Sequence, residues 1–314
     1  MTASPRAVVI GESLVDLVWH TGADVIRPLP GGSPANVAIG LHRLGHPVTL
    51  ITSWGDDLPG TLVSRHLSVT GLDVLRVPAA SGRTTVAVAY VDSATGSATY
   101  DFLAAWDPAH IPIGPDTVVL HTGSLAVVVE PGATQVLRAC EQLHGRPGRV
   151  VAADLNVRPA VQPDRAAYRV AVERLAGVAD VVKASDEDLA WLWPEHDPAE
   201  SARALLGHGP RLVVLTRGPQ GAVGFSADAE VSVAAPRTSV IDTIGAGDAF
   251  QSALLASLLG PHPDGTDAAH VPTGGQEVER VLRQCVMAGA LATTRAGAQP
   301  PTLDELRTAS FVRP

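Results

Sequence analysis

The hydrophobic residues of this chain lie in short continuous runs that alternate with segments of helical periodicity. A short continuous apolar run, closed by glycine or a polar residue, is typical of a strand buried on both faces of a parallel sheet. Such runs predict strands at residues 7–10, 48–52, 74–77, 118–120, 150–153, 181–183 and 212–215. Helical spacing predicts a helix opening at Pro34 and further helices near residues 58–68, 130–143, 166–176, 186–193, 249–259, 276–294 and 302–308. The alternation predicts an α/β fold of right-handed βαβ units, with a central, mostly parallel sheet covered on both faces.

Residues 84–91 and 97–102 depart from this pattern, because they are rich in β-forming residues and have no helix between them. The stretch that separates them, Asp92-Ser-Ala-Thr-Gly96, is a hairpin signal. We therefore predict a small β element, built from about residues 12–30 and 82–108, within a single domain that spans residues 1–314. Such an element over the ligand-binding edge would act as a lid that excludes water. Because a small exposed sheet has edges and a face to cover, a homodimer through this lid is also expected.

The stretch Asp242-Thr-Ile-Gly-Ala-Gly-Asp-Ala-Phe250 is the strongest candidate for chemistry. Three small residues, Gly245, Ala246 and Gly247, stand directly before Asp248 and an apolar helical run. Unpaired N–H groups at a helix N-terminus attract anions, and small residues let the backbone approach a ligand closely. Because a carboxylate would repel a phosphate, Asp248 makes chemical sense as a base that takes a proton from the group attacking that phosphate. For an isolated motif of this kind, the alternative is a tight turn with a carboxylate that stabilises the helix start.

Polar and small residues around the first strand and the first helix form a second candidate group. Glu12 and Asp16 follow the first strand, at the edge where open α/β sheets bind ligands, and could accept hydrogen bonds from a polyol. Gly31 and Gly32 give the backbone freedom for close approach or for a hinge, and the amide of Asn36 could reach a ligand from the first helical turn. The alternatives are solvated loop acids and an ordinary capped helix with a flexible entry.

Composition and charge narrow the classes of function. The 314 residues are 46% hydrophobic, and a net charge of −9 without a run of five like charges argues against nucleic acid as a partner. Two cysteines, Cys140 and Cys285, are too few for a disulfide or zinc framework. No apolar run approaches the roughly 18 residues of a membrane span, and no signal peptide precedes the first strand, so we expect no membrane partner and a cytoplasmic location. The chain also lacks a P-loop, the third glycine of a dinucleotide fingerprint and a Gly-x-Ser-x-Gly elbow.

The two glycine stretches together carry a family resemblance. Gly31-Gly-Ser-Pro-Ala-Asn-Val-Ala38, with Gly45 and Gly55 downstream, resembles the first signature of the ribokinase-like sugar kinases, the PfkB family. Asp242-Thr-x-Gly-Ala-Gly-Asp248 resembles the second signature, and the resemblance extends over essentially the whole chain. It implies a ribokinase-like three-layer α/β sandwich with a small β-sheet lid, and a phosphotransferase that uses ATP to phosphorylate a sugar hydroxyl.

Softer motifs make the chain most similar to the fructokinases, which convert fructose to fructose 6-phosphate. These motifs are Gly11-Glu-Ser-Leu-Val-Asp16, Tyr100-Asp-Phe102 to Trp106, His121-Thr-Gly-Ser-Leu125, Asp154-x-Asn156-x-Arg158 and Lys183-x-Ser185-Asp-Glu-Asp188. The same machinery acting on 2-keto-3-deoxygluconate, ribose or a nucleoside stays an alternative, because neither Glu12 nor Asp16 selects among polyols. A more remote alternative is a sugar- or nucleotide-binding regulator that has kept the fold and lost catalysis.

The resemblance implies a role for each candidate residue. Asp248 would be the catalytic base, the backbone N–H groups of Gly245, Ala246 and Gly247 would form the anion hole, and Arg158 would approach phosphoryl or sugar oxygens. The residues on the sugar side would be Glu12, Asp16, Gly31, Gly32, Asn36, Tyr100, Phe102 and Trp106. The residues on the nucleotide side would be Lys183, Ser185, Thr216, Arg217, Gly218, Gly221, Ala288 and Ala292.

The resemblance also implies ATP and Mg²⁺ as cofactors, with K⁺ as a monovalent activator common in the family. Asp242 would lie near the monovalent cation, and Asp188 near the magnesium and its water network. The family often has Asn-x-x-Glu at the latter position, whereas this chain has Ser185-Asp-Glu-Asp188, a departure that bears on any direct contact of Asp188 with the metal. Ala253 stands where a glycine often follows in the second signature, and it suits a helical position.

Overall fold

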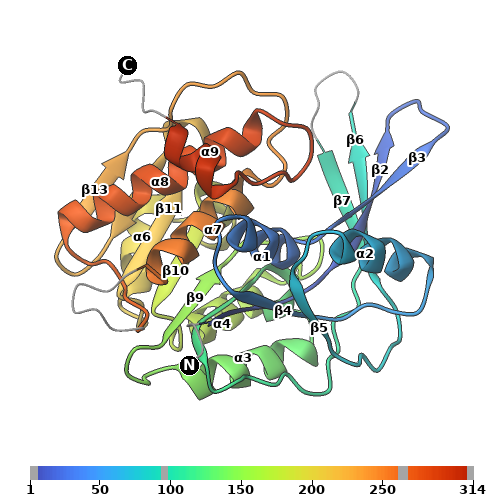
Figure 1. The fold of residues 1–314 in the computed structure, drawn as a ribbon, viewed down its shortest axis with the longest axis horizontal. Helices are drawn as coiled ribbons and strands as arrows, with labels where there is room; N and C mark the ends of the chain where they lie inside the picture. The colour runs from blue at the N-terminus through green and yellow to red at the C-terminus, as the bar shows by residue number, and fades with distance from the viewer. Residues whose placement is uncertain (1–5, 93–97, 261–267, 310–314) are drawn as a thin grey trace.

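The computed structural model describes residues 6–92, 98–260 and 268–309, and a nine-stranded sheet forms its centre (Figure 1). Seven neighbouring strands are parallel, and two antiparallel strands, β12 and β13, extend one edge. The strands follow the order β13 (Glu230–Val233), β12 (Ala222–Phe225), β11 (Leu212–Thr216), β10 (Val181–Ser185), β9 (Val150–Asp154), β8 (Thr117–Gly123), β1 (Arg6–Ile10), β4 (Val48–Thr52) and β5 (Asp73–Arg76).

Helices cover both faces of this sheet, and a separate hydrophobic core lies on each side. Side chains alternate along the strands, so Val9 packs into one core while Val8 and Ile10 pack into the other. The helices of the first core are α1 (Ser33–Arg43), α2 (Leu58–Ser68), α7 (Ala246–Leu258) and α8 (Gly275–Thr293). Those of the second are α3 (Gly132–Leu143), α4 (Arg165–Ala176), α5 (Asp186–Leu192) and α6 (Pro198–Leu206). This arrangement confirms the predicted three-layer α/β class.

The sequence pattern did not predict β12, β13 or α6. Strands β12 and β13 have four residues each, and glycine interrupts the apolar run of β12 at Gly224. An added Cβ on Gly224 would lie 2.7 Å from the side chain of Val278, so helix α8 packs closely over this position. Helix α6 begins with a capping box formed by Asp197 and Glu200, a local signal that the periodicity count missed. A last helix, α9 (Leu303–Thr308), and two 3₁₀ turns, η1 (Ser124–Val127) and η2 (Gly218–Gln220), complete the described elements.

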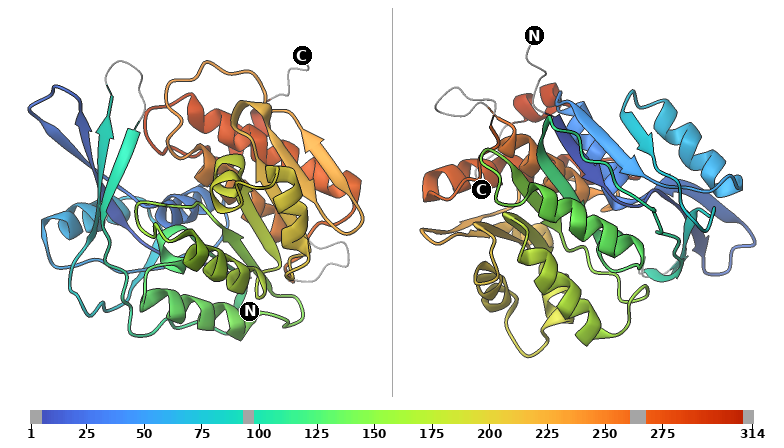
Figure 2. Two further views of the ribbon diagram at one scale, coloured as in Figure 1. Left: turned by 180° about the vertical axis from the view of Figure 1, so that it is seen from behind. Right: turned by 90° about the horizontal axis from the view of Figure 1, so that it is seen from below.

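A four-stranded small sheet stands to one side of the main body (Figures 1 and 2). Its order is β3 (Ile26–Gly31), β2 (Leu14–His20), β6 (Thr85–Val91) and β7 (Ala98–Leu103), with β2 and β6 parallel and the outer pairs antiparallel. These strands lie in and around the segments expected to form the lid. Residues 93–96 of the predicted hairpin signal, which runs from Asp92 to Gly96, lie outside the described residues. The division of the chain into one domain with a lid stays our interpretation.

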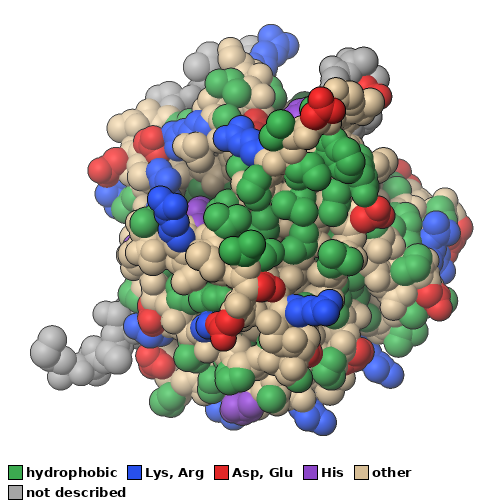
Figure 3. Space-filling model, turned by 90° about the vertical axis from the view of Figure 1, so that its right-hand side faces the viewer, with side chains coloured by type: hydrophobic (Ala, Val, Ile, Leu, Met, Phe, Trp, Pro, Cys, Tyr) green, Lys and Arg blue, Asp and Glu red, His purple; other side chains and the backbone are tan. Residues whose placement is uncertain are grey.

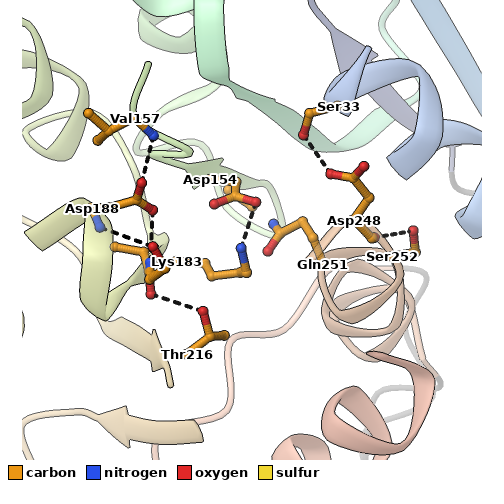
Figure 4. A network of polar contacts seen from close by, with 12 residues as sticks. Ser33, Asp154, Val157, Lys183, Asp188, Thr216, Asp248, Gln251 and Ser252 are labelled. Carbon is orange, nitrogen blue, oxygen red and sulfur yellow. Dashed lines mark hydrogen bonds and ion pairs between the residues drawn. The ribbon is translucent and has the colours of Figure 1, made fainter. Parts of the chain in front are cut away.

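The parallel strands deliver their polar residues to one edge of the large sheet. Strand β1 ends at Ile10 just before Glu12, β9 ends at Asp154, and β10 ends at Ser185. Helices α1 and α7 begin beside this edge, where the hydroxyl of Ser33 on α1 bonds to the carboxylate of Asp248 on α7 (Figure 4). The candidate residues therefore meet at the carboxyl ends of the strands, where ligands bind in open α/β sheets.

Candidate active site

Helix α7 begins with the three small residues that were predicted to form an anion hole. Gly245 is the N-cap and has a φ of 76°, and an added Cβ would lie 2.7 Å from the Cβ of Ala298. Both the backbone conformation and the close neighbour therefore require glycine there. No side chain caps the helix, so its first N–H groups are not taken up by a capping side chain. An added Cβ on Gly247 would lie 3.7 Å from Nζ of Lys183, which places an ammonium group beside this helix start.

The carboxylate of Asp248 lies between the N-termini of two helices. Its Oδ1 accepts a hydrogen bond of 2.6 Å from the hydroxyl of Ser33 (Figure 4). Its Oδ2 accepts one of 2.8 Å from the amide of Asn36. Ser33 and Asn36 belong to the first turn of α1, so the positive ends of both helix dipoles face this carboxylate. Burial raises the pKa of Asp248 above its ordinary value, and the two hydrogen bonds oppose that rise. The site thus holds a partly buried base whose ionised form is disfavoured by burial and partly recovered by these two hydrogen bonds.

Two further carboxylates and one guanidinium share the electrostatic field of Asp248. Burial raises the pKa of Glu12 to about 7 and that of Asp16 to about 6, and in both cases Arg158 lowers the pKa while Asp248 raises it. One oxygen of Glu12, Oε2, is buried without a hydrogen-bond partner among the described residues. Gly31 lies against Asp16, since an added Cβ would be 2.9 Å from Oδ2 of that residue. The carboxyl groups of Glu12, Asp16 and Asp248 thus form an acid-rich pole, a cluster of acidic groups beside the guanidinium of Arg158. Such a cluster is suited to a ligand with several hydroxyl groups.

The pH dependence of stability follows from Glu12. A carboxyl whose pKa rises from 4.5 in the unfolded chain to about 7 in the folded protein loses its proton first in the unfolded state. Stability therefore falls as pH rises between these values, by an amount on the order of 3 kcal/mol. We expect Glu12→Gln to be more stable than the wild type at pH 8 and to lose this advantage at pH 5. Urea unfolding at the two pH values checks this, and an advantage that is equal at both would contradict it.

A buried ion pair lies on the other side of the anion hole. Nζ of Lys183 on β10 is 2.7 Å from Oδ2 of Asp154 on β9, and their side chains are 5% and 4% exposed (Figure 4). The second oxygen of Asp154, Oδ1, is buried and has no hydrogen-bond partner among the described residues. The pair holds the ammonium group of Lys183 near Gly247, where it would face an incoming phosphate.

The geometry around Ser185 and Asp188 is that of a helix cap. The hydroxyl of Ser185 accepts from the N–H of Asp188, and Asp188 Oδ2 accepts from the N–H of Ser185, which makes a capping box for α5. The other oxygen of Asp188 accepts from the N–H of Val157, 2.8 Å away (Figure 4). These contacts fix the loop that carries Arg158. The metal role of Asp188 and the nucleotide role of Ser185 stay predictions.

Asp242 ties the segment before α7 to the end of α8. Its Oδ2 accepts from the N–H of Gly297 and its Oδ1 from the N–H of Ile244, while the N–H of Ile241 donates to the carbonyl of Thr293. These bonds shape the loop that leads into the anion hole. A monovalent cation at Asp242 stays a prediction.

The remaining nucleotide-side residues follow strand β11. The hydroxyl of Thr216 lies 3.4 Å from the carbonyl of Ala184, and Arg217 donates to the hydroxyl of Ser232. Gly218 and Gly221 have positive φ values of 49° and 91°, so the turn between β11 and β12 needs glycine at both ends. The contact of these residues with the nucleotide stays a prediction.

Three residues that were predicted to contact the substrates are buried. Trp106 is 1% exposed and packs against Gly132 at the start of α3. Ala288 and Ala292 are fully buried in the packing of α8. The contact of Trp106 with the sugar and those of the two alanines with adenine stay predictions.

Tyr100 and Phe102 lie on the face of the small sheet that also carries Asp16. The register pairs Asp16 with Ala87 and Ala87 with Phe102, and the rings of Tyr100 and Phe102 stack with centroids 6.1 Å apart. Tyr100 is 41% exposed, and both Asp16 and Arg158 act on its pKa, which burial raises. The structure thus brings these aromatic rings toward the acid-rich pole.

Sequence reasoning gave no role to two residues of this site. Ser33 binds Asp248 from a position 215 residues away, and Asp154 pairs with Lys183 from 29 residues away. Ser33 lay inside the first glycine stretch and Asp154 inside a strand-end motif, which were the only signals that the sequence offered.

Comparison with known proteins decides the family of this chain. The model of the pfkB family carbohydrate kinases matches residues 5–305. The chain belongs to this family. It is 35% identical to a fructokinase of Rhizobium leguminosarum bv. trifolii over 79% of this chain and 78% of that protein. It is 33% identical to a fructokinase of Klebsiella pneumoniae over 95% of this chain and 97% of that protein.

Solved structures of this kinase family share the fold. A double mutant of the fructokinase from Vibrio cholerae O395, bound to fructose, ADP and potassium ion, superposes with a TM-score of 0.79 at 26% identity over all of both chains. The aminoimidazole riboside kinase from Salmonella enterica, bound to its riboside and an ATP analog, gives a TM-score of 0.78 at 25% identity over 96% of this chain and 99% of that chain. The predicted family and ribokinase-like fold of this carbohydrate kinase are thus confirmed.

Proposed function

We propose that this carbohydrate kinase transfers the γ-phosphoryl group of ATP to a hydroxyl of fructose and releases fructose 6-phosphate. One observation carries the proposal: the carboxylate of Asp248 stands in the first turn of α7, beside the anion hole and the ammonium group of Lys183. Phosphoryl transfer requires a group that accepts the proton of the attacking hydroxyl and an anion hole for the phosphoryl oxygens, and both lie at this helix start. Fructose is the acceptor named for the relatives with 35% and 33% identity over most of this chain.

The reaction moves one proton and one phosphoryl group. Asp248 accepts the proton of the sugar hydroxyl, whose oxygen forms a bond to the γ-phosphorus, while the bond from that phosphorus to the bridging oxygen of ADP breaks. The N–H groups of Gly245, Ala246 and Gly247 would stabilise the charge that develops on the phosphoryl oxygens. A carboxylate is a weak base, but the hydroxyl becomes acidic late in a loose transfer, so positioning supplies most of the rate.

The other site residues would position the two substrates. Glu12, Asp16 and Asn36 offer hydrogen bonds to the sugar, Gly31 and Gly32 let the backbone close over it, and Tyr100 and Phe102 cover it from the small sheet. Arg158 would bind sugar or phosphoryl oxygens. Lys183 would bind the nucleotide phosphates, and Ser185, Thr216, Arg217, Gly218 and Gly221 would line the nucleotide side.

Mg²⁺ would enter with ATP as part of the substrate. The described residues contain no cluster of three or more His, Cys, Asp or Glu that could hold a metal ion. The ATP phosphates and water would supply most of the ligands of the magnesium ion. The buried Oδ1 of Asp154, which has no hydrogen-bond partner among the described residues, would orient a water ligand of that ion. K⁺ at the Asp242 loop is part of the proposal, because the related Vibrio cholerae structure holds a potassium ion.

An assay of ADP release tests the proposed reaction. With Mg·ATP, we expect a clear preference for fructose over ribose, 2-keto-3-deoxygluconate, adenosine and tagatose. A preference for another acceptor would leave the proposed mechanism unchanged but would show that the substrate is not fructose. A riboside is one such alternative, because a related kinase has been solved with a riboside bound. Binding of ATP without turnover on any acceptor would favour the non-catalytic regulator.

We also propose that the outer face of the small sheet pairs two copies of this chain. Trp19 and Tyr90 are paired in register with ring centroids 6.2 Å apart, and they are 41% and 40% exposed. Ile26 pairs with Trp19 on the other side, and Leu103 is 71% exposed. Figure 3 shows hydrophobic side chains gathered on this side of the molecule. Such a patch on a sheet with open edges is typical of an interaction surface.

Sedimentation tests this pairing directly. We expect a dimer for the wild type at micromolar concentration, and a monomer for Trp19→Glu, because a buried unpaired carboxylate at the centre of the patch opposes association. A wild-type monomer would contradict the proposal. Val170→Glu, which changes an exposed apolar residue of α4 away from the small sheet, is the matched control and should stay dimeric.

No helix of the described segments has the length and apolar character that crossing a bilayer requires. A cytoplasmic location and the absence of nucleic-acid partners stay predictions from the sequence.

A further inference from the structure

The hydroxyl of Ser33 is not used by the helix in which it stands. Ser33 is the first residue of α1, and the N-cap of that helix is Gly32, which provides no side-chain cap. A serine at a helix start commonly bonds to the backbone of its own first turn. Here the hydroxyl instead donates to Oδ1 of Asp248 over 2.6 Å, the short distance typical of a hydroxyl bonded to a carboxylate.

The backbone before Ser33 is built to hold this hydroxyl in one place. Gly32 has a φ of 114°, and an added Cβ would lie 2.6 Å from the carbonyl oxygen of Glu12. Strand β3 of the small sheet ends at Gly31, so the chain passes from the small sheet to α1 through these two glycines. A side chain on Gly32 would displace the start of α1, and with it the hydroxyl of Ser33.

A second contact fixes α1 against α7. The hydroxyl of Ser252 on α7 donates to the carbonyl of Val37 on α1 over 3.0 Å and also lies 2.7 Å from the carbonyl of Asp248. Gly40 packs directly on Ser252, so close that an added Cβ would overlap its hydroxyl. The two helices therefore form one rigid pair, and Ser33 reaches Asp248 across a gap that the packing sets.

We propose that Ser33 is a positioning residue for phosphoryl transfer: its hydroxyl fixes the rotation of the Asp248 carboxylate toward the sugar hydroxyl and stabilises its ionised form. The inference rests on the proposed function, because it takes Asp248 as the base. Asn36 holds the other oxygen over 2.8 Å, so the two bonds together define the plane of the carboxylate. Ser33 itself exchanges no proton and touches no reacting atom.

The charges that face Asp248 come from several elements. Lys183 on β10 and Asp154 on β9 act on its pKa. Asp248 in turn acts on the pKa values of Glu12 after β1 and Asp16 on β2, which Arg158 after β9 also affects. Removing the hydroxyl of Ser33 leaves all five charges in place. A change in the pH dependence of catalysis in that variant therefore reports the lost hydrogen bond.

The test compares the pH profiles of kcat/KM for the wild type, Ser33→Ala and Ser33→Thr. Loss of a hydrogen bond to the ionised base should move the acid limb of Ser33→Ala upward by about one pH unit. We expect kcat/KM to fall by up to about tenfold on the acid limb, below its wild-type midpoint, with a smaller loss above the limb and little change in the KM for ATP. Ser33→Thr keeps the hydroxyl and should restore the wild-type limb. Ser257→Ala, which removes a hydroxyl near the far end of α7, is the matched control.

Because Glu12 and Asp16 also titrate near neutral pH, the profiles are repeated in the Glu12→Gln background, where the shift caused by Ser33→Ala should persist. An acid limb that does not move in Ser33→Ala would overturn the claim that the hydroxyl stabilises the ionised base. Wild-type kcat at every pH in that variant would overturn the positioning role. Ser33→Cys, with a weaker donor of similar size, replaces Ser33→Ala if the alanine variant misfolds. A wild type without phosphoryl transfer would refute the proposed function itself, which is a different result from an active enzyme with an unmoved limb.

Discussion

Replacing Asp248 by asparagine is expected to lower kcat roughly 1,000-fold, within the range that a general base contributes. Asparagine has nearly the same shape and can still bond to Ser33, but it has no lone pair basic enough to take the proton of the sugar hydroxyl. The anion hole of Gly245, Ala246 and Gly247 would remain, so the residual rate should exceed that of the reaction in water. KM values for sugar and ATP should change far less than kcat.

Steady-state kinetics with Mg·ATP and fructose measure this effect. Asp304→Asn removes an exposed carboxylate of α9 and is the matched control, for which we expect wild-type turnover. Turnover near the wild-type value in Asp248→Asn would refute the proposed mechanism. A raised KM with unchanged kcat would instead assign Asp248 to sugar binding.

Removing the charge of Lys183 should destabilise the protein by about 3–5 kcal/mol, because it leaves the buried carboxylate of Asp154 without a partner. The two side chains are 5% and 4% exposed, so water cannot replace the lost ammonium group without opening the structure. Lys183→Met has a side chain of similar length and therefore changes mainly the charge. The effect should appear in urea unfolding and as a lower Tm.

The double variant Lys183→Met with Asp154→Leu supplies the control. Replacing both partners of a buried ion pair with apolar residues of similar volume is often neutral for stability, so we expect it to recover most of the loss. The free energy of unfolding of the single variants Lys183→Met and Asp154→Leu is then compared with that of the double variant. The amount by which the two single effects fail to add measures the coupling of the pair. If Lys183→Met alone were as stable as the wild type, the proposed stabilising role of the ion pair would be wrong. If the double variant were stable and bound ATP as tightly as the wild type, Lys183 would not be a phosphate-binding residue.

The order of strands and helices could be predicted from this sequence because each depends on local pattern. The runs at residues 48–52 and 150–153 are apolar throughout since parallel strands are buried on both faces, and the observed β4 and β9 coincide with them to within one residue. The helix at residues 58–68 was predicted from its spacing and is α2. The short antiparallel edge strand β13 was not predicted, because a half-exposed segment of four residues shows too little periodicity in its hydrophobic positions.

The residue types at the site could be predicted for a related reason. Gly245 is the N-cap of a helix start that has no side-chain cap, and it has a positive φ. Because glycine adopts this conformation most readily, the residue type itself predicts a turn at this position. Asp248 could then be placed in the first turn by counting. Chemistry that depends on one local segment is visible in that segment.

Only the tertiary structure decided which distant groups meet and which side chains point inward. The bond between Ser33 and Asp248 joins residues 215 positions apart, and no local pattern encodes such a distance. Trp106 and Ala288 lie in segments that the family motifs favoured, yet both are buried because the packing of α3 and α8 turns them inward. The pKa of Glu12 likewise depends mainly on its burial in the folded chain, and further on Ser124, Arg158 and Asp248, which lie far from it in the sequence. Local sequence determines conformation through short-range sterics, whereas burial and charge environment arise from the sum of contacts across the fold.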